Sequence, residues 1–164
     1  MTEIRAAIAA DEAELAGIDA ASWSPDVTPA AERPADAPFF THRTSPEDVL
    51  VAVVDAQVAG YVSLRQTIPL PSHQHVLEVS GLAVDPRFRG QGIGRRLVEA
   101  AKQEARRRGA RKLSLRVLGP NAVAQRLYES CGLRVEGRLV AEFLIEGRAV
   151  DDLLMAVDLT ERSA

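Results

Sequence analysis

Apolar residues along the chain recur at two spacings, one typical of strands and one typical of helices. Residues 49–54 are all apolar and predict a buried strand, and a short turn connects them to a partner strand over residues 58–65. The two strands are expected to form an antiparallel hairpin. Residues 3–8 predict a further strand near the start of the chain, and residues 135–145 and 149–159 predict a second hairpin near its end.

Helical spacing of apolar residues predicts a helix over residues 92–109, with Gly109 as its C-cap. A second helix is expected to begin at Asn121, a residue type that caps helix N-termini well, and to close at Gly132. A strand over residues 112–117 lies between these helices. Strand, helix and strand in this order predict a parallel crossover unit.

The first helix is expected to end near Ala21. Asp11 and Glu14 resemble a capping box, in which the first residue caps the helix and the residue three positions later bonds back to it. Leu15 and Ile18 then provide one apolar face.

Residues 22–46 are predicted to be irregular, because five prolines and several small residues exclude a long regular element. The segment nevertheless contains Trp23, Phe39 and Phe40, in a chain with few aromatic residues. Disordered linkers are usually poor in aromatic residues. We therefore expect an ordered loop or broken helix that packs against the rest of the protein.

The strand that precedes residue 85 contains a slip in its apolar alternation. Leu77 and Val79 have one parity, and Leu82 and Val84 have the opposite one. A slip of one residue is what a β-bulge inserts, and glycine within a strand often marks one. The sequence therefore predicts a bulge at Ser80–Gly81, with a plain strand interrupted by a glycine as the alternative.

A glycine-rich loop over residues 89–94 follows this strand and runs into the helix at 92–109. The first amides of a helix have no intrahelical partner, and glycines let an anion approach the backbone closely. A phosphate-binding P-loop is excluded because no Lys-Ser/Thr follows, and the dinucleotide fingerprint fails because Arg95 stands where its third glycine belongs. The remaining interpretations are a different anion site or a turn that only caps the helix.

Composition limits the class of protein. A chain of 164 residues with 46% hydrophobic residues suits a single domain, 1–164, with one core. The net charge of −3 disfavours nucleic-acid binding, and the absence of a long apolar run or a leader-like start leads us to expect a cytoplasmic protein with no membrane partner. Cys131 is the only cysteine, and no Cys/His cluster has metal-ligand spacing, so no metal is expected.

The loop and the helix at 121–132 together resemble a known family. Residues 89–94 read Arg-x-x-Gly-x-Gly, which is similar to the acyl-CoA loop of the GNAT family of N-acetyltransferases. Residues 121–133 read Asn-x-x-Ala-x-x-Leu-Tyr-x-x-x-Gly-Leu, similar to the second motif of that family except that Leu133 replaces the usual Phe. The resemblance covers residues 49–159. It implies an α/β fold with a mixed, mainly antiparallel sheet that is splayed at a central parallel pair, and with helices on both faces.

The same resemblance implies a binding site for acetyl-CoA, the acyl donor. Loop amides would hold the pyrophosphate, the Leu82 amide would polarise the thioester carbonyl, and Val84 would pair with the pantetheine. Arg89 and Arg95 are expected at phosphate groups. The complete set of predicted cofactor-binding residues is Leu82, Ala83, Val84, Arg89, Gly90, Gln91, Gly92, Ile93, Gly94, Arg95, Asn121 and Tyr128.

Acetyl transfer to an amine needs a base for the amine and an acid for the leaving thiolate. We predict direct attack with Tyr128 as the acid, since a phenol with a pKa of about 10 can protonate a thiolate. Glu78 is the predicted base, acting through water, and a merely solvated or ion-paired glutamate is the alternative. Rival acidic residues lie on the last hairpin, namely Glu142, Asp151 and Asp152. Cys131 is taken as a core residue rather than a nucleophile, because a helix C-terminus disfavours a thiolate.

The expected acceptor is the primary amine of a small molecule or of a peptide or protein N-terminus, and a homodimer is the assembly considered. Two other functions remain open at this point: a CoA-binding or sensing module without turnover, and a nucleotide-binding protein that uses the same loop.

Overall fold

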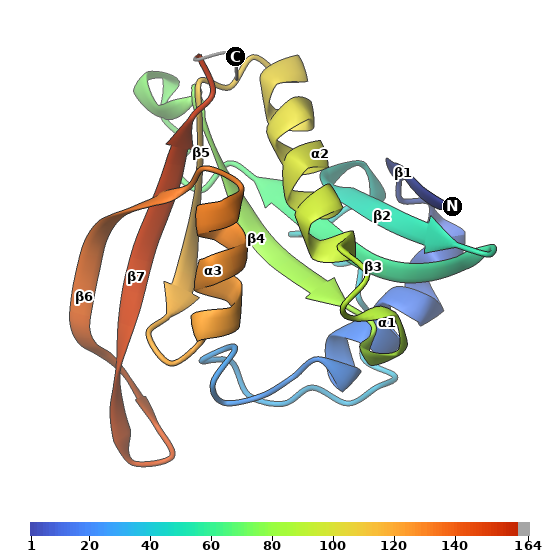
Figure 1. The fold of residues 1–164 in the computed structure, drawn as a ribbon, viewed down its shortest axis with the longest axis horizontal. Coiled ribbons are helices and arrows are strands. Elements are labelled where there is room, and N and C mark those ends of the chain that lie inside the picture. The colour runs from blue at the N-terminus through green and yellow to red at the C-terminus, as the bar shows by residue number, and fades with distance from the viewer. Residues whose placement is uncertain (161–164) are drawn as a thin grey trace.

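The computed structural model describes residues 1–160, which form one seven-stranded sheet in the order β1-β2-β3-β4-β5-β7-β6 (Figure 1). Neighbouring strands are antiparallel except for β4 and β5, which are parallel. The fold expected from the sequence is therefore confirmed. The strands are β1 (Thr2–Ala6), β2 (Val49–Val54), β3 (Gln57–Arg65), β4 (Val76–Val84), β5 (Lys112–Leu118), β6 (Arg134–Ile145) and β7 (Arg148–Asp158).

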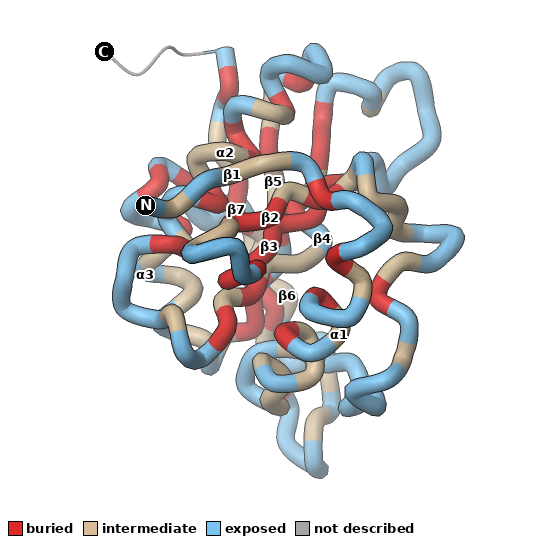
Figure 2. Tube along the Cα trace, turned by 90° about the vertical axis from the view of Figure 1, so that its right-hand side faces the viewer, coloured by how far each residue is buried: buried red, intermediate tan, exposed pale blue. Residues whose placement is uncertain are grey.

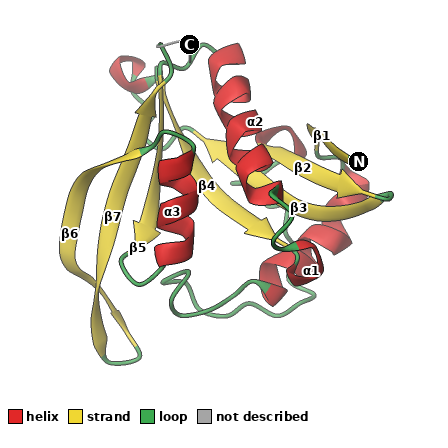
Figure 3. Ribbon diagram, in the orientation of Figure 1, coloured by secondary structure: helices red, strands yellow, loops and turns green. Residues whose placement is uncertain are grey.

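Helices cover both faces of the sheet, with α2 and α3 on the same face (Figure 3). The helices are α1 (Glu12–Ala21), α2 (Ile93–Arg107) and α3 (Ala122–Ser130). Buried residues of α2 and α3 share one core cluster with the central strands, while Leu15 and Ile18 of α1 belong to a second cluster. Figure 2 shows the buried segments gathered in the central strands. No helix within residues 1–160 is long and apolar enough to cross a membrane.

The parallel pair is joined over only part of its length. Hydrogen-bonded pairing of β4 with β5 runs from Val76 opposite Lys112 to Val79 opposite Leu115, and goes no further. Beyond these residues β4 continues beside β3, and β5 continues beside β7. In Figure 1 the two strands start side by side near the C-terminus and separate towards the end where residues 22–46 cross below them.

The predicted bulge in β4 is confirmed. Ser63 of β3 lies opposite Gly81, and the next residue, Leu64, lies opposite Val79, so Ser80 is the extra residue. Its hydroxyl lies 2.9 Å from the Ser63 hydroxyl. The extra residue bends β4 and reverses the direction of its side chains, which accounts for the parity slip in the sequence.

The capping box predicted for α1 is wrong. Asp11 precedes the helix but makes no side-chain cap bond to it. Its carboxylate instead receives two hydrogen bonds from Arg5, at 2.8 and 2.9 Å, and one from the Ile8 amide at 2.9 Å. Glu14 accepts from the Val58 amide at 2.9 Å. Both carboxylates therefore connect α1 to the sheet and leave the helix start uncapped by them.

Residues 22–46 are irregular, as predicted, and they contact the rest of the protein through Phe39, the one buried residue of the segment. The amides of Phe39 and Phe40 donate to the Glu12 carboxylate at 2.6 and 3.0 Å. The Phe39 ring lies edge-to-face against Tyr61 of β3, with centroids 4.8 Å apart. The indole of Trp23 donates to the Ala30 carbonyl at 2.9 Å, which fixes the shape of the first part of the segment.

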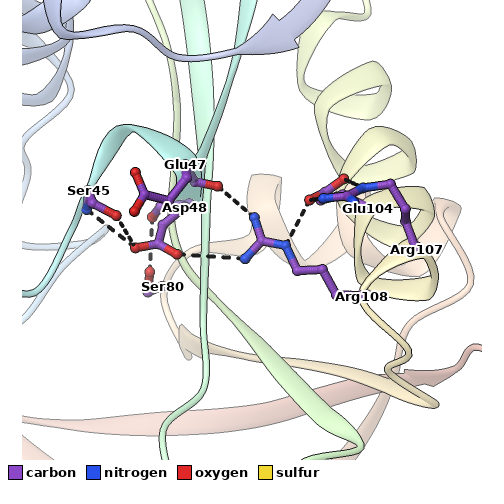
Figure 4. A network of polar contacts seen from close by, with 8 residues as sticks. Ser45, Glu47, Asp48, Ser80, Glu104, Arg107 and Arg108 are labelled. Carbon is purple, nitrogen blue, oxygen red and sulfur yellow. Dashed lines mark hydrogen bonds and ion pairs between the residues drawn. The ribbon is translucent and has the colours of Figure 1, made fainter.

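A network of polar side chains connects the end of this segment to the end of α2 (Figure 4). Arg108 donates to Glu104 at 2.7 Å and to the Glu47 carbonyl at 2.6 Å, and it lies 3.6 Å from Asp48. Asp48 in turn accepts from the Ser45 hydroxyl at 2.8 Å. The network holds α2 against the start of β2.

Candidate active site

A cavity of about 450 Å³ opens where β4 and β5 separate. One side is formed by the two diverging strands and by α3, and the other by the end of α1 and the segment that follows it. The lining residues that matter below are Asp19, Ser22, Arg33, Tyr61, Ser80, Leu82, Ala83, Arg116, Asn121 and Tyr128.

The β4 side of the cavity is an unpaired strand edge. Residues 81–84 pair with β3 on one side, and on the side towards β5 they have no strand partner. Leu82 and Ala83 line the cavity, as expected of residues that meet an extended ligand. Val84 is not among the lining residues, and its carbonyl accepts from Arg89 at 3.3 Å. An unpaired edge offers backbone donors and acceptors to an extended group such as pantetheine.

The start of α2 presents a run of free amides. Gly90 and Gly92 have φ values of 75° and 76°, a left-handed conformation that glycine adopts without strain. The amides from Gly90 to Arg95 have no hydrogen-bond acceptor within residues 1–160, and the first helical bond comes from Arg96 to the Gly92 carbonyl at 3.2 Å. Six consecutive free N–H groups at the positive end of a helix are suited to a diphosphate.

The glycine loop lies next to α3 and to the end of β4, although it does not line the cavity itself. A Cβ atom added to Gly94 would lie 3.2 Å from Leu127 of α3 and 3.9 Å from Val84. The free amides of the loop and the cavity therefore lie on either side of Val84 and Leu127, close enough for one elongated ligand to reach both.

Asn121 caps α3 as predicted. Its side-chain oxygen accepts from the Ala124 amide at 3.2 Å, and its backbone begins the helix that carries Tyr128. Because that oxygen is engaged, the side-chain NH₂ group is the part of Asn121 available to a ligand in the cavity.

Tyr128 lies on α3, with a buried ring and with a place in the cavity wall. Its hydroxyl has no hydrogen-bond partner within residues 1–160. Burial, together with the neighbouring Cys131, raises the pKa of Tyr128 to about 12. The phenol is therefore protonated throughout the physiological range, as an acid must be. Cys131 itself is buried, and burial raises its pKa, as expected of a core thiol.

Glu78 is not among the residues that line the cavity. It lies on β4 two residues before Ser80, with its carboxylate 3.6 Å from Arg65 and its side chain 19% exposed. A water chain would have to connect it to an amine in the cavity, so its role as base stays a prediction.

The three rival acids are all engaged by arginines. Asp151 pairs with Arg138 at 2.5 Å and accepts from the Ala141 amide, and these contacts lower its pKa. Asp152 and Glu142 both approach Arg116, at 2.5 and 3.6 Å. Arg116, which contacts two of these acids, lines the cavity, whereas the three acids do not.

A second polar cluster in the cavity could not be expected from the sequence. Tyr61 of β3 donates to Asp19 of α1 at 2.7 Å, and Arg33 approaches the other oxygen of the same carboxylate at 3.8 Å. These residues are far apart in the chain, and none belongs to a recognisable motif. Only the packing of residues 22–46 over the sheet brings them together.

Comparison with known proteins indicates the same class of protein as the open strand edge and the free amides described above. Residues 14–133 match the model of the acetyltransferase (GNAT) family. The L-methionine sulfoximine/L-methionine sulfone acetyltransferase of Salmonella typhimurium is 30% identical over 116 residues, which are 71% of this chain and 67% of that protein. The L-amino acid N-acyltransferase MnaT of Escherichia coli is 30% identical over 145 residues, 88% of this chain and 82% of that protein.

Among solved structures, the ribosomal-protein-alanine N-acetyltransferase of Brucella melitensis superposes with a TM-score of 0.76 at 27% identity. The match covers 95% of this chain and 99% of that one. Sequence and fold comparisons therefore lead to the same group of enzymes.

Proposed function

Because this chain belongs to the GNAT family of acetyltransferases, we propose that it transfers an acetyl group from acetyl-CoA to the primary amine of a small molecule or of a peptide or protein N-terminus. The observation that carries this proposal is the separation of β4 from β5 after Val79 and Leu115. It leaves a strand edge free beside a cavity whose wall contains a protonated tyrosine.

The residues present fit the donor. Free amides from Gly90 to Arg95 match a diphosphate, with Arg89 and Arg95 exposed beside them. The open edge at Leu82, Ala83 and Val84 matches an extended amide-containing arm. Acetyl-CoA supplies the acyl group as a thioester, which an amine can attack directly.

In the proposed reaction, Glu78 accepts a proton from the amine and Tyr128 donates a proton to the leaving sulfur. The acceptor first loses the proton of its ammonium form to solvent. The amine nitrogen then forms a bond to the carbonyl carbon while a second proton passes through water to Glu78. The bond from that carbon to sulfur breaks, and the Tyr128 hydroxyl donates its proton to the departing sulfur. Solvent then returns a proton to Tyr128 and removes one from Glu78. The amide of Leu82 is the proposed donor to the carbonyl oxygen, on which negative charge develops.

Calorimetry with acetyl-CoA, followed by a thiol-release assay over a panel of amines, tests the proposal. We expect binding, and release of free CoA with at least one class of amine. Binding without release for any amine would indicate a sensing module, and binding of ATP or NAD that CoA cannot displace would indicate a nucleotide-binding protein. Either result would overturn the proposed reaction.

A further inference from the structure

One wall of the cavity contains a pair of opposite charges that have no charged partner within residues 1–160 other than each other. Three lining residues carry a formal charge: Asp19, Arg33 and Arg116. Arg116 is engaged by Asp152 and Glu142. Asp19 and Arg33 face each other at 3.8 Å, beyond hydrogen-bond distance, with side chains that are 35% and 47% exposed.

Each member of the pair is held by a neutral group and keeps bonding capacity for a ligand. One oxygen of Asp19 accepts from the Tyr61 hydroxyl at 2.7 Å, and the other has no hydrogen-bond donor within residues 1–160. Arg33 uses one terminal nitrogen to donate to the Pro38 carbonyl at 2.7 Å. A free carboxylate oxygen therefore lies next to free guanidinium donors.

The pair is close to the site where the acyl group is expected. A Cβ atom added to Gly81 in the β4 bulge would lie 3.5 Å from the Tyr61 hydroxyl oxygen. That hydroxyl donates a hydrogen bond to Asp19. A ligand group bound by Asp19 is thus separated from the bulge by little more than the tyrosine hydroxyl.

The wall around the pair has two further features. Ser22 lines the cavity, and its hydroxyl oxygen is buried without a hydrogen-bond partner within residues 1–160. Buried polar groups normally have a partner, and this hydroxyl would gain one if its side chain rotated towards a bound ligand. The neighbouring wall from Trp23, Val27 and Pro29 is largely apolar.

We propose that Asp19 and Arg33 recognise the ammonium and the carboxylate of a free α-amino acid, and that Tyr61 positions Asp19 for this contact. An α-amino acid carries both charges on one carbon, which matches an anion and a cation side by side. A peptide N-terminus has an ammonium but a neutral amide in place of the carboxylate, so it would offer Arg33 no carboxylate in addition to that of Asp19. The apolar wall suits an aliphatic side chain such as that of leucine.

This inference rests on the proposed acetyl transfer, and its test uses thiol release from acetyl-CoA with leucine and with leucinamide. Leucinamide keeps the amine and the side chain but has no carboxylate. The wild type is expected to prefer leucine. Arg33→Gln is expected to lower kcat/KM for leucine by about tenfold or more while changing the value for leucinamide less than about twofold. Asp19→Asn, which keeps an acceptor for Tyr61, is expected to lower kcat/KM for both.

Tyr61→Phe is a positioning variant, and a double-mutant cycle separates its role from a structural one. Its effect on kcat/KM for leucine should largely disappear in the Asp19→Asn background, whereas a purely structural effect would add to that of Asp19→Asn. Arg43→Gln and Asp36→Asn are matched controls in the same segment, since both residues are exposed and lie outside the cavity. Both controls are expected to leave the leucine reaction unchanged.

The outcomes distinguish this inference from the function on which it rests. If no amine releases CoA, the proposed transfer itself is wrong. If the wild type acetylates amines but prefers leucinamide or a peptide N-terminus to leucine, the transfer stands and the charge-pair assignment is overturned. Equal losses on leucine and leucinamide in Arg33→Gln would also refute it.

Discussion

Replacing Tyr128 by phenylalanine removes one oxygen atom from the centre of the proposed site. The ring fills the same buried position, with only 8% of the residue exposed, so packing in the core is retained. The hydroxyl has no hydrogen-bond partner within residues 1–160, and its removal therefore breaks no bond inside the protein. Tyr128→Phe thus separates the chemistry of the hydroxyl from the stability of the fold.

Two magnitudes follow from this geometry. General acid catalysis typically contributes about 10²- to 10⁴-fold, so kcat should fall by about 10²-fold or more while acetyl-CoA binding stays near normal. The free energy of unfolding should stay unchanged or rise by up to about 1 kcal/mol, because a partly buried hydroxyl without a partner is removed. Tm should then rise by no more than about 4 °C.

Tyr61, the other tyrosine of the chain, serves as the comparison for the change in the free energy of unfolding. Tyr61 is also buried, but its hydroxyl donates to the Asp19 carboxylate at 2.7 Å. Tyr61→Phe should therefore lower the free energy of unfolding by about 1.5 kcal/mol, the scale of a hydrogen bond to a charged group. Thermal melts of both variants and thiol-release kinetics of Tyr128→Phe supply the measurements. Full turnover by Tyr128→Phe would show that another group protonates the thiolate.

Four further outcomes can be measured. Gly92→Glu should abolish CoA binding in calorimetry, whereas Gly147→Glu, with a φ of 77° against 76° for Gly92, carries the same backbone strain in a distant turn and should bind normally. Gly60→Ala should lower the free energy of unfolding by about 1–3 kcal/mol in denaturant melts, because its Cβ would lie 2.8 Å from the Ala83 carbonyl oxygen; wild-type stability would refute this contact. Two arginines at the end of α2 lower the pKa of Glu104 from 4.5 to about 2 (Figure 4), so its stabilising effect is complete above pH 4.5 and is lost as the pH falls towards 2. Glu104→Gln should therefore destabilise the protein by about 1 kcal/mol at pH 7 and hardly at all at pH 2, and equal effects at both pH values would contradict the ion pairs. Since the pKa of Tyr128 is about 12, kcat/KM should rise with pH as the acceptor amine loses its proton, with no decline from phenol ionisation at pH 10 in a pH–rate profile.

Local patterns in the sequence were sufficient to predict the sheet, the bulge in β4 and the glycine loop at the start of α2. The parity slip between Val79 and Leu82 reflects the bulge directly, because side chains in a strand alternate by residue. The loop at 89–94 was recognisable because glycines and a helix start are adjacent in the chain. Each feature lies within a stretch of fewer than about ten residues. Sequence patterns predict local backbone structure over stretches of this length.

Interactions between distant segments could not be predicted in this way. The Asp11 carboxylate had a local role available as a helix cap, but Arg5 and the Ile8 amide compete for it more effectively in the folded protein. The Tyr61 to Asp19 hydrogen bond joins residues 42 positions apart, and no periodicity reports it. The proposed acceptor side of the cavity depends on such contacts, and for this reason its residues could be named only from the structure.

The free amides at the start of α2 also predict a sensitivity of this protein to buffer anions. Unpaired N–H groups from Gly90 to Arg95 are suited to sulfate or inorganic phosphate as well as to a diphosphate. Such buffer ions should act as inhibitors competitive with the acyl donor and should raise its KM in proportion to their concentration. Kinetic constants for this protein are therefore comparable only when the buffer anion is the same, with chloride or a zwitterionic buffer as the reference.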